Sequence, residues 1–207
     1  MKKDIKIVIP CYDRFDLLKQ TLQSLKDFEI IFDTYLYFDG IAPWEVKEIA
    51  HQYKVDLKET GLMENLGADL MIYKSTMLFE EDHVLIIDSD TIIIKDFTHF
   101  IIDNIKLFEN DPAVVGISIA KGDKYLIHYK GYENARLLNM GCGTIYDKKH
   151  VKDCLDAYLK YPSLPLDSHG GKIAKKKKLY YVNSKNIFTK HLGLNSGFHS
   201  SIDIIHS

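Results

Sequence analysis

Residues 83–94 read HVLIIDSDTIII, an apolar run interrupted by two aspartates that stand one residue apart, Asp88 and Asp90. Continuous apolarity over so short a span predicts a central strand that is buried on both faces. In an open α/β sheet, ligands bind beyond the carboxyl ends of the strands, so both carboxylates are expected at that edge. The repulsion between the two carboxylates is tolerable when a divalent cation or hydrogen-bond donors offset their charge, which predicts a metal site. The alternative is that either aspartate caps the next turn.

Strands and helices are predicted to alternate on both sides of this run. Strands are expected in residues 5–10, 34–40 and 113–119, and helices in residues 14–28, 43–53, 64–79, 96–108 and 148–160. Asp13 is the expected N-cap of the first helix. This order predicts an α/β fold with a mostly parallel central sheet and helices on both faces. The last fifty residues, punctuated by proline and glycine, are expected to be more irregular.

Composition limits the possible classes of protein. A chain of 207 residues, 46% of them hydrophobic, can bury an ordinary core, so a single domain is expected. Lys and Arg number 27 against 29 Asp and Glu, which argues against a surface that coats nucleic acid. Three cysteines without C-x-x-C spacing predict reduced thiols in a cytoplasmic protein. No apolar run approaches the roughly 20 residues of a membrane-spanning helix.

Several short motifs follow one another along the first hundred residues. IKIVIPCYDRFD (residues 5–16) places Pro-x-Tyr-Asp-Arg after a strand, YFDG (37–40) ends the second strand, ENLGAD (64–69) follows, and IIDSD comes at 86–90. In this order and spacing the motifs resemble the GT-A-fold, family-2-like glycosyltransferases. That family usually has Asn where this chain has Asp13.

The resemblance implies a single GT-A domain over residues 1–207, with a nucleotide-sugar-binding half (1–95) and an acceptor-binding half (96–207). It implies a nucleoside diphosphate sugar donor, UDP-linked or related, and a Mn²⁺ or Mg²⁺ cofactor. Asp90, Asp88 and His191 would be the metal ligands. The donor-binding residues would be Pro10, Tyr12, Arg14, Asp39, Asn65, Gly67, Asp88 and Ser89.

The second half of the chain resembles the inverting members of this family. In residues 164–193, Asp167 precedes the aromatic run LYYV and then His191, the order of a general base and a metal-contacting histidine in the family. Leu166 stands where the family usually has Glu, and His169 is a competing base. NMGCGTIY (139–146) resembles a segment of retaining GT-A enzymes, so the stereochemistry stays open.

Two other functions compete with sugar transfer. A phosphohydrolase of the haloacid-dehalogenase type would use Asp88 as nucleophile, Asp90 as acid/base and Ser118 in its second motif. Ile92, the lack of a later Asp-Asp pair and the late position of the motif argue against it. A module that binds a nucleotide or a glycan without turnover is the third reading, because fold does not fix function.

The expected acceptor is a glycan, a lipid or another hydroxyl compound. A nucleic acid is disfavoured because the lysines at 175–178 lack interleaved aromatics; the run is either a solvated turn or an acceptor-steering patch. Tyr125, Tyr129 and Tyr132 are candidates for stacking on sugar rings or for packing. The resemblance places the protein in the cytoplasm of a bacterial cell or of a virus-infected host cell.

Overall fold

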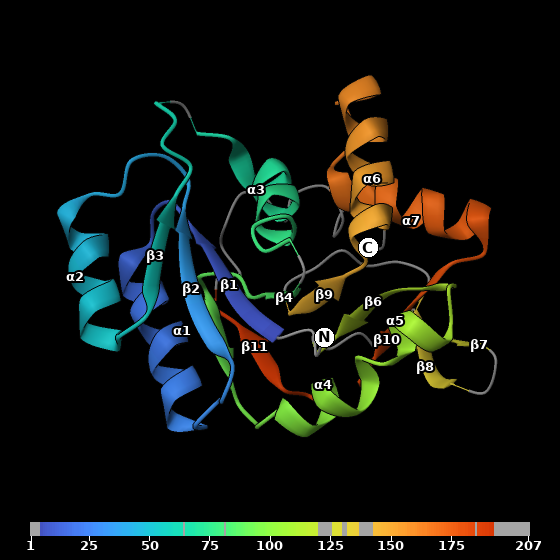
Figure 1. Cartoon of the computed structure of the whole chain (residues 1–207), viewed down its shortest axis with the longest axis horizontal. Helices are drawn as coiled ribbons and strands as arrows, with labels where there is room; N and C mark the ends of the chain where they lie inside the picture. The colour runs from blue at the N-terminus through green and yellow to red at the C-terminus, as the bar shows by residue number, and fades with distance from the viewer. Residues whose placement is uncertain are drawn as a thin grey trace, which may run out of the picture.

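The protein is built around a nine-stranded sheet with helices on both faces, as a computed structural model shows (Figure 1). The structure describes residues 5–63, 65–80, 82–119, 126–129, 132–136, 143–184 and 186–192. The strands are β1 (Ile5–Cys11), β2 (Asp33–Phe38), β3 (Asp56–Glu59), β4 (His83–Ile86), β5 (Thr91–Ile93), β6 (Val114–Ser118), β7 (Leu126–Tyr129), β8 (Tyr132–Arg136), β9 (Thr144–Tyr146), β10 (Tyr180–Asn183) and β11 (Thr189–His191). The helices are α1 (Phe15–Asp27), α2 (Trp44–Tyr53), α3 (Gly67–Thr76), α4 (Thr98–Asn104), α5 (Leu107–Asn110), α6 (Lys148–Lys160) and α7 (Leu166–Lys177).

The large sheet is parallel in its first half and mixed in its second. Its strand order is β3-β2-β1-β4-β9-β6-β10-β8-β7, and β3, β2, β1 and β4 are mutually parallel. β9 lies antiparallel between β4 and β6, while β6 and β10 are parallel. β5 and β11 form a separate antiparallel pair. The mostly parallel central sheet with flanking helices is therefore confirmed, and its mixed part holds five of the nine strands.

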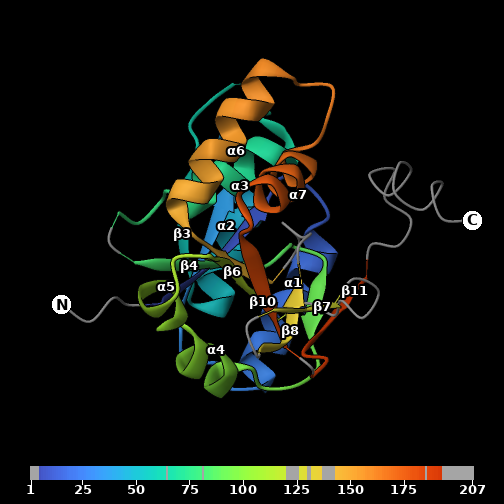
Figure 2. The same cartoon turned by 90° about the vertical axis from the view of Figure 1, so that its right-hand side faces the viewer.

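Each face of the sheet carries its own hydrophobic layer. On one face, the buried side chains of α1, α2 and α4 pack against Ile7, Ile9 and Leu85. On the other face, α3, α6 and α7 cover Val8, Val84 and other alternate residues of the same strands. Figure 2 shows α3, α6 and α7 above the strands and α1 and α4 below them. Strands buried on both sides must be apolar throughout, which explains the uninterrupted run before Asp88.

The helix boundaries correct several expectations from sequence. Asp13 does not cap α1: the N-cap position is Arg14, whose backbone is left-handed (φ 58°) and which makes no side-chain cap bond. The helix expected over residues 96–108 is divided into α4 and α5, and the one expected over 64–79 spans only α3. The region expected to be irregular contains α7, and the lysines at 175–177 form its last turn.

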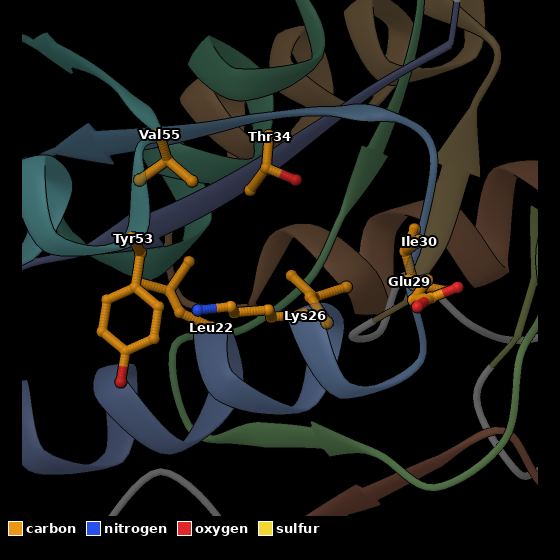
Figure 3. A pocket seen from close by; sticks show the side chains of 8 residues that line it. Leu22, Lys26, Glu29, Ile30, Thr34, Tyr53 and Val55 are labelled. Carbon is orange, nitrogen blue, oxygen red and sulfur yellow. The ribbon is translucent and has the colours of Figure 1, made fainter.

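The amino edge of the sheet holds a pocket of about 330 Å³ between α1, α2 and the start of β2 (Figure 3). It is lined by Leu22, Leu25, Lys26, Glu29, Ile30, Thr34, Tyr53 and Val55. These residues belong to the second half of α1, the end of α2, the start of β2 and the loops that follow the two helices, so the pocket lies at the opposite edge from Asp88 and Asp90. Among the described residues, no helix is both long enough and apolar enough to cross a membrane.

Candidate metal and donor site

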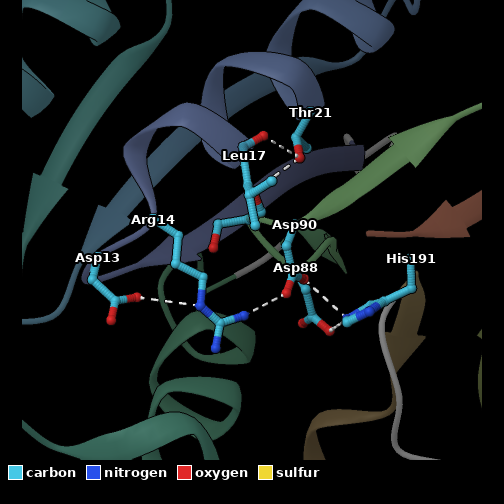
Figure 4. Close-up of polar contacts among 8 residues, drawn as sticks. Asp13, Arg14, Leu17, Thr21, Asp88, Asp90 and His191 are labelled. Carbon is cyan, nitrogen blue, oxygen red and sulfur yellow. Dashed lines mark hydrogen bonds and ion pairs between the residues drawn. The ribbon is translucent and has the colours of Figure 1, made fainter. Parts of the chain in front are cut away.

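Two carboxylates and an imidazole converge at the carboxyl end of β4. The ligand atoms of Asp88, Asp90 and His191 all lie within 4.8 Å of one another. His191 Nε2 is 2.9 Å from Asp90 Oδ1 and 3.9 Å from Asp88 Oδ2, as Figure 4 shows. Asp90 is nearly buried, whereas about two fifths of the Asp88 side chain is exposed. The cluster therefore combines a nearly buried carboxylate, Asp90, with a partly exposed one, Asp88.

Strand pairing brings His191 across a hundred residues to this point. β11 pairs antiparallel with β5, and the register sets His191 opposite Thr91, next to Asp90. The Leu192 N–H donates to the Asp90 carbonyl at 2.7 Å, and the Thr91 N–H donates to the Asp88 carbonyl at 3.1 Å. A tight turn and a two-stranded ladder together hold the three side chains in place.

Helix α1 supports the same turn from below. The Thr21 hydroxyl donates to the Ser89 carbonyl at 2.9 Å, and the Ser24 hydroxyl accepts from the Ile93 N–H at 2.8 Å. Both bonds are made from a helix that packs on the sheet, so the Asp88–Asp90 turn is held by tertiary contacts as well as by its own backbone. Ser89, expected to bind the donor, here engages α1 through its carbonyl group.

The basic side chains of Arg14 and His191 offset the negative charge of Asp90. Arg14 Nη1 lies 2.7 Å from Asp90 Oδ2, and His191 occupies the other oxygen. Burial alone would raise the pKa of Asp90, but the hydrogen bond from His191 and the positive charges of His191 and Arg14 outweigh it and lower the pKa. The hydrogen bond to Asp90 raises the pKa of His191, against the opposing effect of burial.

The three candidate metal ligands suit a hard divalent cation. Two carboxylates suit Mg²⁺ or Mn²⁺. The imidazole of His191 would favour Mn²⁺, the softer of these two ions. Because Arg14 and His191 already provide positive charge to Asp90, a cation would replace or share those contacts. Three protein ligands would leave coordination positions for phosphate oxygens.

Four of the predicted donor-binding residues lie along the same edge, at the ends of β1 and β2: Pro10, Tyr12, Arg14 and Asp39. Tyr12 is half exposed, and its ring stacks on Phe38 at a centroid distance of 6.1 Å. Pro10 lies within β1, at its carboxyl end. Arg14, expected in the base pocket, instead reaches Asp90.

Asp39 is largely occupied by backbone groups of the next helix. Its carboxylate accepts hydrogen bonds from the Leu66 N–H at 2.9 and 3.1 Å and from the Gly67 N–H at 3.1 Å. The side-chain oxygen of Asn65 also accepts from the Gly67 N–H, at 2.6 Å. The carboxylate of Asp39 thus fixes the start of α3, because the first N–H groups of a helix have no partners within it.

A second acidic residue fixes the start of α7, where the predicted base lies. Asp69 of α3 accepts from the Leu166 N–H at 3.0 Å, next to Asp167. Asp167 Oδ1 is buried and has no hydrogen-bond partner among the described residues. Burial, and to a smaller extent the charge of Asp69, raise the pKa of Asp167. Asp69 belongs to the ENLGAD motif, but nothing in the motif predicts its contact with Leu166, 97 residues later.

Other candidate residues divide into those that are placed and those that are not described. His169 is buried in α7, with Nε2 3.0 Å from the Tyr161 carbonyl oxygen, so it is not a solvated loop residue. Tyr125 and the segment 139–142 lie outside the described residues, and the side chains of Tyr129 and Tyr132 are not described.

Comparison with known proteins rests on structure. No family profile matches the sequence, and no curated protein matches it either. The mannosyltransferase from Pyrobaculum calidifontis, solved with GDP-Man and Mn²⁺, superposes with a TM-score of 0.64 at 12% identity. The superposition covers 97% of this chain and 60% of that one. The chain has the GT-A fold.

Two further GT-A-like structures extend the comparison. The glycosyltransferase GlyE of Streptococcus pneumoniae matches with a TM-score of 0.56 at 17% identity, over 89% of this chain and 46% of that one. The 4-diphosphocytidyl-2C-methyl-D-erythritol synthase of Anaerococcus prevotii matches with a TM-score of 0.56 at 14% identity, over 90% and 89% of the chains. The chain thus spans 60% and 46% of the two glycosyltransferases, and the GT-A fold alone does not select one reaction.

Proposed function

We propose that this GT-A protein is a metal-dependent glycosyltransferase. It would move a sugar from a nucleoside diphosphate sugar to an acceptor hydroxyl, through inversion at the transferred carbon. The observation that carries the proposal is the convergence of Asp88, Asp90 and His191 at the carboxyl edge of the sheet. The Pyrobaculum mannosyltransferase, which has the same fold, was solved with a nucleoside diphosphate sugar and Mn²⁺.

Each group in the site has a distinct task in this reaction. Asp90, Asp88 and His191 would hold Mn²⁺ or Mg²⁺. A bound cation would supply charge neutralisation for the departing diphosphate. Asp167 would take the proton of the acceptor hydroxyl during attack, since an alcohol is a poor nucleophile. Support for this role comes from its buried oxygen, which has no partner within the described part of the chain, and from a pKa that burial raises.

The two halves of the chain would divide the substrates between them. Residues 1–95 would bind the nucleotide, with Pro10 and Tyr12 beside the base and Asn65 and Gly67 near the start of α3. The Asp39 carboxylate already accepts hydrogen bonds from the first amides of α3, so it would contact the nucleotide base only through its remaining lone pairs. Residues 96–207 would bind the acceptor, a glycan, a lipid or another hydroxyl compound. The free, buried thiols Cys11 and Cys154 are compatible with action in the cytoplasm. UDP is the expected nucleotide.

A haloacid-dehalogenase-like phosphohydrolase is less well supported by the fold. In that reading the strand before Asp88 would begin the domain. Here β4 is the fourth strand along the chain and pairs with β1, which lies between β2 and β4. Ser118, its second candidate residue, is hydrogen-bonded to Thr144 inside the sheet. The first eighty residues are thus an integral part of the sheet that carries the carboxylates.

Calorimetric titration tests the donor site. Wild-type protein is titrated with UDP, GDP and dTDP in Mn²⁺ and in EDTA, and the titrations are repeated on Asp90→Ala. We expect one nucleotide to bind in Mn²⁺, with binding lost in EDTA and in the variant. Absence of binding by every nucleotide with either Mn²⁺ or Mg²⁺ contradicts the proposal, and a phosphatase screen on wild type and Asp88→Asn follows.

Donor turnover tests the base. Once the nucleotide is known, release of nucleoside diphosphate from its sugar conjugates is measured with a panel of sugar acceptors. Asp167→Asn should lower kcat by 10²-fold or more, because general base catalysis typically contributes 10²–10⁴-fold. The Kd of the nucleotide should remain unchanged. Full activity of Asp167→Asn would assign the base elsewhere, and His169→Asn is the matched comparison.

A further inference from the structure

A row of polar side chains crosses the buried sheet at its carboxyl edge. The strand register sets Thr144 of β9 beside Ser118 of β6, and Ser118 beside Asn183 of β10. The Thr144 hydroxyl donates to the Ser118 hydroxyl at 3.0 Å. Asn183 is 2% exposed, and within the part of the chain that the structure describes, neither Nδ2 nor Oδ1 has a hydrogen-bond partner.

An unpaired amide in this position requires an explanation. Buried polar groups in folded proteins are nearly always hydrogen-bonded, and leaving one unpaired costs stability. Positions in a buried strand usually hold apolar residues, such as the neighbouring Val182. A primary amide offers two N–H donors and a carbonyl acceptor, which is the set that pairs with a hydroxyl group. The unused bonding capacity of Asn183 therefore points to a ligand.

The fold places Asn183 and the predicted base toward the same edge of the sheet. The Leu166 N–H donates to Asp69, near the start of α3 at the carboxyl edge, so the first turn of α7 lies toward that edge. Tyr181 occupies the same face of β10 as Asn183, two residues earlier. Leu166, the residue before Asp167, packs in the same buried layer as Tyr181. Among the described residues, Asp167 Oδ1 is likewise buried without a partner.

The proposed metal ligands and Asn183 lie three strands apart along one edge of the sheet. β4 and β10 are separated by β9 and β6, so three strand spacings, about 14 Å in total, lie between their ends. Ile86, two residues before Asp88, and Tyr181, two residues before Asn183, both belong to the layer that α3, α6 and α7 cover. The carboxylates and the amide thus lie at the same edge of the sheet.

We propose that Asn183 binds a sugar hydroxyl beside Asp167, and that the Thr144–Ser118 pair forms the adjoining polar floor. Asn183 is then a specificity-determining residue for the reaction. The inference rests on the proposed glycosyl transfer and deepens it. The hydroxyl belongs to the transferred sugar or to a sugar acceptor, two sources with the same chemistry, and the experiment below separates them.

The test compares Asn183→Ala with wild type and with Ser75→Ala. Ser75 supplies the matched control, because its hydroxyl is also buried without a partner but lies in α3. The Kd values of UDP, GDP or dTDP, whichever binds, and of the corresponding sugar conjugates (UDP-glucose, UDP-GlcNAc, GDP-mannose, dTDP-glucose) are measured in Mn²⁺. For a transferred sugar, Asn183→Ala should remove tenfold or more of the preference for the conjugate over the bare nucleotide, with the nucleotide Kd unchanged.

The other outcomes are equally specific. For a sugar acceptor, the Kd of the conjugate and the rate of its hydrolysis stay unchanged, while the KM for glucose, galactose, mannose or GlcNAc as acceptor rises tenfold or more. The thermal midpoint of ligand-free Asn183→Ala should equal or exceed that of wild type. A lowered midpoint with unchanged sugar binding and acceptor KM assigns the amide to a buried structural water and overturns the inference. If no nucleotide binds wild type, the glycosyltransferase proposal fails first and the role of Asn183 fails with it.

Discussion

The carboxylate of Asp90 contacts two cationic side chains at once, and both contacts bear on metal binding. Arg14 and His191 take one oxygen each, at 2.7 and 2.9 Å. Arg14 holds this position from a left-handed backbone conformation, φ 58°, which non-glycine residues rarely adopt. Strain of this kind is found at functional sites. Arg14 is thus placed to balance the charge of Asp90, and it would compete with a bound cation.

We therefore expect Arg14→Ala to bind Mn²⁺ several-fold more tightly than wild type when no nucleotide is present. Removal of the guanidinium frees Asp90 Oδ2 and removes a positive charge that repels the ion. Mn²⁺ affinity is measured by electron paramagnetic resonance of the free ion. Lys6→Ala, which removes an ion pair with Asp33 at the amino edge of the sheet, is the control and should leave the affinity unchanged. Weaker Mn²⁺ binding by Arg14→Ala would contradict this competition.

Asp167 allows a prediction about pH. Burial and the nearby charge of Asp69 raise the pKa of Asp167, and only its ionised form can act as a base. Activity should thus fall as pH drops through this raised pKa. Asp69→Asn keeps an oxygen to accept the Leu166 N–H but removes the charge, so the acid limb of the kcat/KM profile should move to lower pH. The exposed Asp16→Asn should leave the limb in place, and an unmoved limb in Asp69→Asn would separate Asp69 from the base.

At the scale of elements, two helices are fixed to the sheet edge by carboxylates from other elements. Asp39 at the end of β2 accepts from the first amides of α3, and Asp69 of α3 accepts from the first amide of α7. The start of α7, which carries Asp167, is therefore held indirectly by β2 through α3. A carboxylate at a helix N-terminus also interacts favourably with the helix dipole.

The packing of α6 and α7 on the sheet depends on one glycine. The register sets Gly116 of β6 opposite Tyr181 of β10, and a Cβ at this position would lie 2.1 Å from the Tyr181 ring. The ring is fully buried, and its hydroxyl is 2.7 Å from His150 Nε2. The tyrosine ring lies over the backbone only because β6 has no side chain there.

Gly116→Ala should therefore destabilise the protein by about 1–3 kcal/mol, the usual cost of overpacking a core. Urea unfolding of wild type, Gly116→Ala, Tyr181→Leu and the double variant measures this cost. We expect the alanine to cost much less when Tyr181 is replaced, since the colliding ring is then absent. Equal costs in both backgrounds would mean that the clash is relieved elsewhere.

At the scale of the whole molecule, a buried histidine couples folding to pH. Burial lowers the pKa of His150 to about 4, from an ordinary value of 6.5. His150 lies between α6 and the sheet, where protonation would place a charge in the core beside Tyr181. The unfolded chain takes up the proton near pH 6.5 and the folded chain only near pH 4, so protonation favours unfolding in between.

The contribution of His150 to stability should thus be complete above pH 6.5 and be lost as pH falls toward 4. Between pH 7.5 and 5 the loss should amount to about 2 kcal/mol, from 1.36 kcal/mol for each pKa unit. Urea unfolding at both pH values is compared for wild type, His150→Phe and the exposed control His99→Asn. The pH dependence should shrink only in His150→Phe, and an unchanged dependence there would place the titrating group elsewhere.

Local sequence pattern determined much of the architecture. Alternating apolar segments predicted the α/β order, and α6 runs from Lys148 to Lys160 as expected. The apolar run before Asp88 predicted a central strand with two carboxylates at its end. These inferences succeed because burial on both faces demands unbroken apolarity, a requirement that any short window of sequence displays.

Contacts across long stretches of chain were decided only by the tertiary structure. The pairing of β5 with β11 sets His191 beside Asp90, the start of α3 takes up the oxygens of Asp39, and Asp69 fixes α7. The unpaired amide of Asn183 likewise becomes visible only once its neighbours are in place. The sequence determined which residues end the strands. Register and packing between distant segments decided which of them meet, because those depend on the whole core rather than on neighbouring residues.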